Sequence, residues 1–190
     1  MRTTMLRSSM MRLIPERLRR LASDQRGVSA VEFAMLLPLM ITLYLGGVEV
    51  SQGISIDRKV TLTARTVADL VSQVASINNS GINNVLTASS AVLAPYPVDK
   101  AKVTVTVISI DANSKVTVSW SDSLNGTARA QGSTVTIPGA LVVPNTSLVW
   151  GEAEYSYKPT IGYVITGTMN LKDQIFMRPR LSDTITRTSS

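Results

Sequence analysis

One long apolar segment dominates the pattern of hydrophobic and polar positions in the first third of the chain. From Val28 to Val48 the only charged residue is Glu32. As a helix that rises about 1.5 Å per residue, this segment is about 31 Å long and matches the hydrocarbon core of a bilayer. A soluble protein buries a helix that is apolar on all sides only inside a large core, and a chain of 190 residues is too short to provide one. We therefore predict that residues 28–50 cross a membrane.

Helical periodicity continues beyond this segment. Apolar residues recur at intervals of three and four, with polar residues on the opposite side, as an amphipathic helix requires. The run Asn78-Asn79-Ser80-Gly81 is a strong helix stop. The pattern predicts one nearly continuous helix from about residue 28 to 77, with Pro38 and the Gly46-Gly47 pair as kink points. Its predicted apolar stripe consists of Ile56, Val60, Ala64, Val67, Leu70, Val71, Val74 and Ile77.

The rest of the chain changes to a mixed pattern. Ser80 is a candidate cap for a short helix that ends at Pro95. Apolar and polar residues then alternate with the period of β-strands, and Asp111–Ser114 is typical of a hairpin loop. We predict an α+β fold in which the long helix packs on a small antiparallel sheet, with residues 51–181 as one domain and 182–190 as a flexible tail. The predicted strands are centred on Val103–Val107, Val116–Trp120, Leu148–Tyr157 and Gln174–Met177.

Charge is concentrated at one end of the chain. Residues 1–26 contain seven arginines against Glu16 and Asp24, a net charge of +5, and the whole chain carries +6, so the rest is nearly neutral. The few remaining cations are scattered, which argues against a nucleic-acid partner. By the positive-inside rule, the basic leader lies in the cytoplasm and residues 50–190 lie across the membrane.

The composition removes several kinds of chemistry. The chain has no cysteine and no histidine, which excludes disulfides, thiolate nucleophiles and the commonest general base and metal ligand. Glu152 and Glu154 share one face of a predicted strand and could bind a hard cation or serve a membrane-tethered hydrolase. A solvated strand face explains them more simply, and we predict neither catalytic nor metal-binding residues. On the same strand Trp150 points away from Tyr155 and Tyr157, which we assign to a core or an interface.

Three processing fates are open for the junction between leader and helix. The chain can remain an uncleaved signal anchor, can be cut after the apolar segment near Gly46-Gly47, or can be cut between Gly27 and Val28. Glycine permits close approach of a protease to the backbone. After the third cut, Glu32 lies one turn inside the new terminus, where its carboxylate could pair with an α-amine. Alternatively, Glu32 snorkels to the headgroups.

The residues at this junction resemble a known processing site. Gly27-Val-Ser-Ala-Val-Glu-Phe33 followed by an apolar helix is similar to the prepilin peptidase site of type IV pilin-like proteins. Arg26-Gly27, Glu32-Phe33 and Met35–Pro38 narrow the resemblance to the TadE/TadG-like pseudopilins, or minor pilins, of tight-adherence (Tad) pilus systems. Further along, Ile137-Pro138, Glu154–Pro159 and Met177–Arg180 also resemble this family.

The resemblance implies a function and a set of partners. It implies a pilin-like fold, cleavage by prepilin peptidase between Gly27 and Val28, and a role for Glu32 and Phe33 in assembly and register. The implied partners are the prepilin peptidase, the major pilin, other minor pilins, the inner-membrane assembly platform and the membrane itself, with no cofactor. The implied location is the bacterial inner membrane, with a periplasmic C-terminal domain and an extracellular pilus as a later destination. The alternative is an uncleaved signal-anchored envelope protein that supports a secretion or pilus complex.

Overall fold

The computed structural model describes residues 25–159, 162 and 166–189. The predicted leader 1–27 therefore lies almost entirely outside the described residues. The chain divides into two compact units, of which the second begins at Val48. The described helices and strands, in chain order, are α2 (Gln25–Ser72), β1 (Ser76–Ile77), α3 (Asn79–Ala91), η2 (Val98–Lys100), β2 (Ala101–Ile110), β3 (Val116–Leu124), η3 (Gly139–Leu141), β4 (Thr146–Tyr157), β5 (Met169–Met177) and β6 (Thr186–Arg187).

The long helix α2 has 48 residues and confirms the predicted N-terminal helix. It continues through both predicted kink points, and the Thr42 hydroxyl donates a hydrogen bond to the carbonyl of Pro38 at 2.8 Å. The predicted end at Ile77 is wrong, because α2 ends at Ser72 and Ile77 belongs to β1. Ile77 is nevertheless buried, so the apolar period that suggested a longer helix reflects core packing by a short strand.

The second helix is capped two residues earlier than predicted. The side chain of Asn78, not Ser80, accepts a hydrogen bond from the Gly81 backbone N–H at 2.8 Å. Asparagine in an extended conformation before a helix is a favourable N-cap. The helix ends at Ala91, four residues before Pro95.

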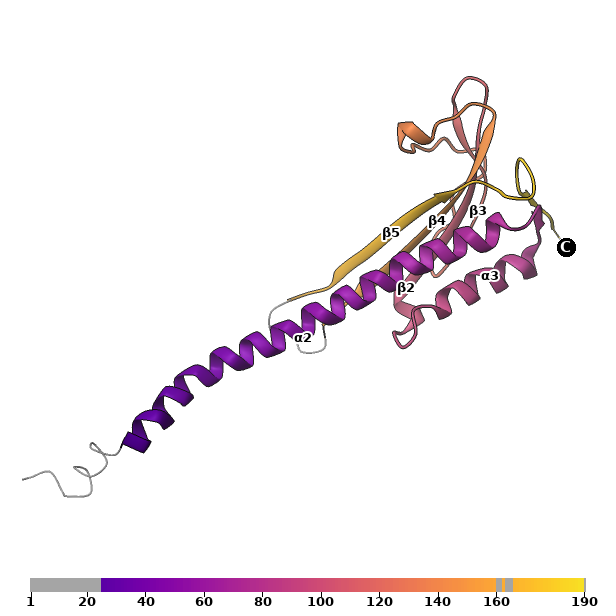
Figure 1. Ribbon diagram of the computed structural model, residues 1–190. Coiled ribbons are helices and arrows are strands. Elements are labelled where there is room, and N and C mark those ends of the chain that lie inside the picture. Colours follow the sequence, from indigo (N-terminus) through magenta and orange to yellow (C-terminus); the bar gives the residue numbers. More distant parts are fainter. Residues whose placement is uncertain (1–24, 160–161, 163–165, 190) are drawn as a thin grey trace, which may run out of the picture. The chain divides into compact units, whose positions relative to one another are not determined.

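The sheet confirms the predicted α+β architecture (Figure 1). Four antiparallel strands lie in the order β3-β2-β4-β5. Asp111 closes the β2–β3 hairpin because its carboxylate accepts hydrogen bonds from the N–H groups of Asn113 and Lys115, each at 2.8 Å. The central strands β2 and β4 pair along their length, from Ala101 opposite Tyr155 to Ile110 opposite Thr146.

One face of the sheet forms most of the core. The part of α2 beyond Val48 packs on this face together with α3, and Val67, Val71 and Val105 are fully buried there. Gly151 on β4 allows the closest approach, since a side chain at this position would collide with the carbonyl oxygen of Ala64. A second cluster places Tyr155 and Tyr157 against α2 and Leu93, as the strand alternation predicts; its α2 members are Ile56, Val60 and Ala64.

A bulge in β3 sends apolar residues to both faces. Val107 lies opposite Trp120 but Ile108 lies opposite Val118, so Ser119 is the extra residue. A bulge reverses the alternation of side chains along its strand. Trp120 therefore packs on the helix-covered face, while Val118 joins a third cluster on the other face. The simple alternation predicted for residues 116–120 is wrong at this point.

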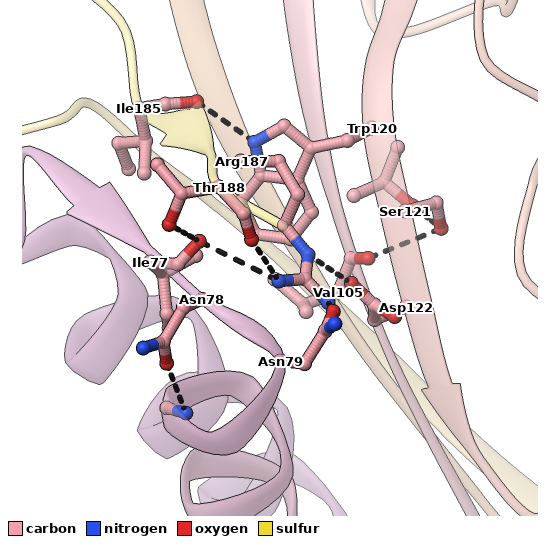
Figure 2. Close-up of polar contacts among 12 residues, drawn as sticks. Ile77, Asn78, Asn79, Val105, Trp120, Ser121, Asp122, Ile185, Arg187 and Thr188 are labelled. Atoms are coloured by element: carbon pink, nitrogen blue, oxygen red, sulfur yellow. Dashed lines mark hydrogen bonds and ion pairs between the residues drawn. The ribbon is translucent and has the colours of Figure 1, made fainter. Parts of the chain in front are cut away.

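The described C-terminal residues make defined contacts with the domain, whereas the sequence predicts a flexible tail over residues 182–190. Ile185 is buried, and its carbonyl accepts a hydrogen bond from the indole N–H of Trp120 at 2.8 Å (Figure 2). Strand β6 pairs in parallel with β1. Arg187 bonds the carboxylate of Asp122 at 3.0 Å and the side-chain oxygen of Asn79 at 2.6 Å. We call residues 182–189 the C-terminal clasp.

Candidate functional site

The candidate processing and assembly residues all lie in the first turns of α2. Gly27, Val28, Glu32 and Phe33 fall within its helical bounds. Val28 is 57% exposed and Phe33 is 59% exposed. Val28 and Glu32 are four residues apart, so their side chains lie one above the other on one face of the helix. The helix thus brings the proposed new terminus and the carboxylate to adjacent positions on a single surface.

The surface around Glu32 is strongly apolar. The segment contains a run of exposed large hydrophobic residues, which would be unfavourable in water but suits lipid or the apolar faces of other helices. Within the described residues, the helix from Gly27 to Ser72 is the one that is long and apolar enough to cross a membrane. The exposed apolar residues of its first half are Val28, Val31, Phe33, Met35, Leu36, Leu37, Leu39, Met40, Ile41, Leu43 and Tyr44.

A second acidic residue of α2 has a different environment. Glu49 is only 1% exposed. Its main-chain oxygen accepts a hydrogen bond from the hydroxyl of Tyr157 at 3.3 Å. Burial, with the nearby Glu49 charge as a smaller contribution, raises the pKa of Tyr157. The position of Glu49 between Val48 and Val50 in the sequence is a signal of this burial.

The two strand glutamates are paired with cations rather than free. The guanidinium of Arg129 makes a bidentate ion pair with Glu152 and lies 3.9 Å from the ring centroid of Trp150. Lys102 lies 3.7 Å from Glu154. In the part of the chain that the structure describes, acidic residues do not gather in a group of three or more that could hold a metal ion. The geometry assigns both carboxylates to ion pairs, and the pair of Lys102 with Glu154 joins two neighbouring strands.

Sequence reasoning missed Arg129. It lies in the irregular segment after β3, where no periodic pattern marks it. Its position over Trp150 depends on a backbone path that begins at Asn125, whose φ of 56° turns the chain and whose side chain donates hydrogen bonds to the carbonyls of Val98 and Ala101.

Comparison with protein families bears on the N-terminal helix. Residues 27–69 match the family model of TadE-like proteins. This TadE-like segment begins at Gly27 and includes Val28, Glu32 and Phe33. Neither a curated protein nor a solved structure matched the chain.

The match covers the N-terminal helix and less than half of the chain. A TadE-like segment suggests a protein associated with a Tad pilus. The single N-terminal apolar helix fits a membrane-anchored protein. The TadE-like segment ends at Asp69, three residues before the end of α2, so the sheet and the C-terminal clasp lie outside it.

Proposed function

We propose that this chain is a minor pilin, or pseudopilin, of a Tad-type pilus, cut by a prepilin peptidase between Gly27 and Val28 and active in pilus assembly and surface adherence. The observation that carries the proposal is the TadE-like match, because it begins at Gly27 and continues through the exposed apolar helix. Cutting there removes the basic leader and leaves the apolar helix as the new N-terminus.

Glu32 has a specific role in this proposal. An ionisable group among apolar residues is costly in a membrane unless it is paired. In the cut chain the α-amine of Val28 is one helical turn from Glu32, and an ammonium–carboxylate hydrogen bond offsets the cost. The carboxylate pairs with the terminal amine of a neighbouring subunit and so sets the register between adjacent helices, with Phe33 packing beside it.

The partners follow from this arrangement. Before cutting, the leader is cytoplasmic and residues 51–181 are periplasmic, because seven arginines precede the apolar segment. The precursor meets the prepilin peptidase and the inner-membrane assembly platform of a bacterial cell. The cut subunit then contacts the major pilin and other minor pilins, in the membrane or in the extracellular pilus.

The Glu32 role is tested by exchanging the side chain. We expect Glu32→Ala to be cut normally and to lower surface piliation by at least about tenfold, because a lost charged pair that is shielded from water is worth about 1.5–3 kcal/mol. Glu32→Asp, which keeps the charge, should retain part of the activity. Thr42→Ala, in the same apolar segment, is the matched control. The measurements are immunoblots for cutting and electron microscopy for pili; normal piliation by Glu32→Ala contradicts the register role.

The alternative is an uncleaved signal-anchored envelope protein that supports a secretion or pilus complex. The same apolar segment and the same basic leader would serve as a permanent anchor. This protein would retain residues 1–27, so the N-terminus of the mature chain separates the two functions.

A further inference from the structure

The two edges of the four-stranded sheet differ in how they are covered. At the β3 edge, residues 133–135 of the segment after the strand form hydrogen bonds with the backbone of Val116 and Val118. At the other edge, β5 has no further strand beside it among the described residues (Figure 1). An uncovered edge strand offers its backbone N–H and C=O groups to a strand of another chain.

One outward N–H group of β5 is already occupied. The backbone N–H of Gln174 donates a hydrogen bond to the carboxylate of Asp173 at 2.7 Å. Alternate residues of an antiparallel edge strand direct their N–H and C=O groups away from the sheet, so Lys172 and Phe176 share the outward orientation of Gln174. The other oxygen of the Asp173 carboxylate accepts a hydrogen bond from the Thr61 hydroxyl of α2 at 2.5 Å. These two bonds hold the carboxylate at the edge.

The charge of this carboxylate is not neutralised. The ion pairs found in the described part of the chain do not include Asp173. Its neighbour Lys172 lies opposite Glu154, whereas Asp173 lies opposite the buried Ala153 on the helix-covered face. Successive side chains of a strand point to opposite faces, so Lys172 is directed away from the carboxylate. A strand added to this edge would therefore meet a negative charge at the middle of β5.

In other respects the sequence of β5 suits pairing with a second copy of itself. The antiparallel register that joins all nine residues places Met169 opposite Met177 of the second copy, and is centred on residue 173. It also places Leu171 opposite Ile175 of the second copy. Apolar pairs directly opposite each other stabilise an antiparallel sheet, so these pairs favour the association of two chains.

Asp173 opposes this register in two ways. It would lie opposite Asp173 of the second copy in a pair that exchanges no backbone hydrogen bonds, where the Cα atoms are only about 4.5 Å apart, and like charges directly opposite are destabilising. The pairing also needs the N–H of Gln174, which the carboxylate occupies. We infer that Asp173 prevents β5 from pairing with β5 of a second copy. This role is independent of the proposed function, since it requires neither cutting at Gly27 nor pilus assembly.

The test measures self-association of the full chain in detergent by light scattering over a range of concentrations. We expect Asp173→Ala to form dimers at least about tenfold more tightly than the unmodified chain. Asp173→Asn removes the charge but keeps a side chain that can accept hydrogen bonds, and should associate to an intermediate degree. Asp57→Ala, which removes an exposed carboxylate from α2, and Thr61→Val, which keeps the Asp173 charge, should associate as weakly as the unmodified chain.

A cysteine at the centre of β5 reports the register, because the chain contains no cysteine of its own. Residues that lie opposite each other without backbone hydrogen bonds have a Cα separation that a disulfide can span. We therefore expect Asp173→Cys to form a disulfide-linked dimer under mild oxidation. The matched control combines Asp173→Ala with Lys172→Cys. Its cysteine lies opposite Gln174 of the second copy and should cross-link far less.

Three results would contradict the inferred role of Asp173. The first is an Asp173→Ala protein that associates no more tightly than the unmodified chain. The second is equal association of Thr61→Val and Asp173→Ala, which indicates that loosening of α2 from the sheet is the cause. The third is equal cross-linking of the two cysteine variants, which indicates association through another surface. Tryptophan fluorescence checks that each variant is folded, and Asp173→Asn takes the place of Asp173→Ala in the comparison if the alanine variant is not.

Discussion

Gly151 lies where α2 packs most closely on β4. A β-carbon there would lie 2.9 Å from the β-carbon of Ala68 and 3.0 Å from a methyl group of Val67, and would collide with the carbonyl oxygen of Ala64. Because the obstacles include a helix backbone, side-chain rotation cannot relieve them. The contact between helix and sheet thus requires a residue without a side chain at position 151.

We expect Gly151→Ala to lower the free energy of unfolding by about 1–3 kcal/mol, the usual cost of overpacking a core. Guanidinium unfolding of the full chain in detergent, followed by tryptophan fluorescence, measures it. The matched control is Gly139→Ala, where a β-carbon meets nothing within 4 Å. A Gly151→Ala protein as stable as this control would show that the helix does not approach the strand so closely.

The two core tyrosines make the fold sensitive to alkali. Burial is the main cause of the raised pKa of both Tyr155 and Tyr157. The unfolded chain loses its phenolic protons near pH 10 while the folded chain keeps them, so unfolding releases protons and stability falls as the pH rises. We expect a constant unfolding free energy up to about pH 9 and a decline above about pH 10.

The variant Tyr157→Phe should show a smaller decline between pH 9 and pH 11 than the unmodified chain, because one of the two phenols no longer titrates. Guanidinium unfolding at each pH provides the measurement. The exposed Tyr44 supplies the control Tyr44→Phe, which should keep the full decline. Identical pH profiles for the Tyr157→Phe and unmodified proteins would contradict the assigned cause.

At the scale of elements, the C-terminal clasp joins parts of the domain that are distant in sequence. The backbone N–H of Thr186 donates to Ala75 at 3.1 Å and that of Thr188 donates to Ile77 at 2.9 Å. The hydroxyl of Ser147 on β4 donates to the carbonyl of Asp183. The clasp therefore holds β1, the start of α3 and the sheet together (Figure 2).

We expect Arg187→Ala to lower the free energy of unfolding by about 1–2 kcal/mol, because it removes an ion pair to Asp122 and a hydrogen bond to Asn79 that are partly shielded from water. Arg178→Ala is the control, since that arginine is exposed and makes no contact of this kind among the described residues. Equal stability of the two variants in denaturant titration would mean that the Arg187 contacts contribute little.

The clasp also shows where sequence reasoning reached its limit. Periodicity predicted the long helix, the β2–β3 hairpin and the third strand, because each has a regular pattern over many residues. The two-residue strands β1 and β6 have no such pattern. A C-terminal segment rich in serine and threonine is typical of a flexible terminus. Ile185 was the available signal, as an isolated apolar residue in a polar stretch, but its partner Trp120 is 65 residues away in sequence.

The candidate site residues also differ in whether a local sequence pattern identifies them. Gly27, Val28, Glu32 and Phe33 are consecutive or one helical turn apart, so a local motif was sufficient to select them. Arg129 follows β3 but pairs with Glu152 on β4, and no local pattern shows that the strand order β3-β2-β4-β5 brings them together. The bulge at Ser119 could not be predicted either, because it is defined by pairing with β2 rather than by its own sequence.

At the scale of the whole molecule, the chain consists of parts suited to different solvents. The first half of α2 exposes apolar side chains on all sides, while the domain beyond Val48 buries its own core and presents polar faces. A pseudopilin needs both properties, because its helix must exist first in lipid and then among other helices. The proposed cut between Gly27 and Val28 leaves both parts in one mature chain.

The most direct test is the intact mass of the protein isolated from the envelope of cells that contain a prepilin peptidase. We predict a mature chain that begins at Val28. We also predict that Gly27→Leu accumulates as an uncut precursor, whereas Gly47→Leu, at the other end of the apolar segment, is cut normally. A mature chain that retains residues ahead of Gly27, or one that begins after Gly47, would contradict the proposed cut between Gly27 and Val28.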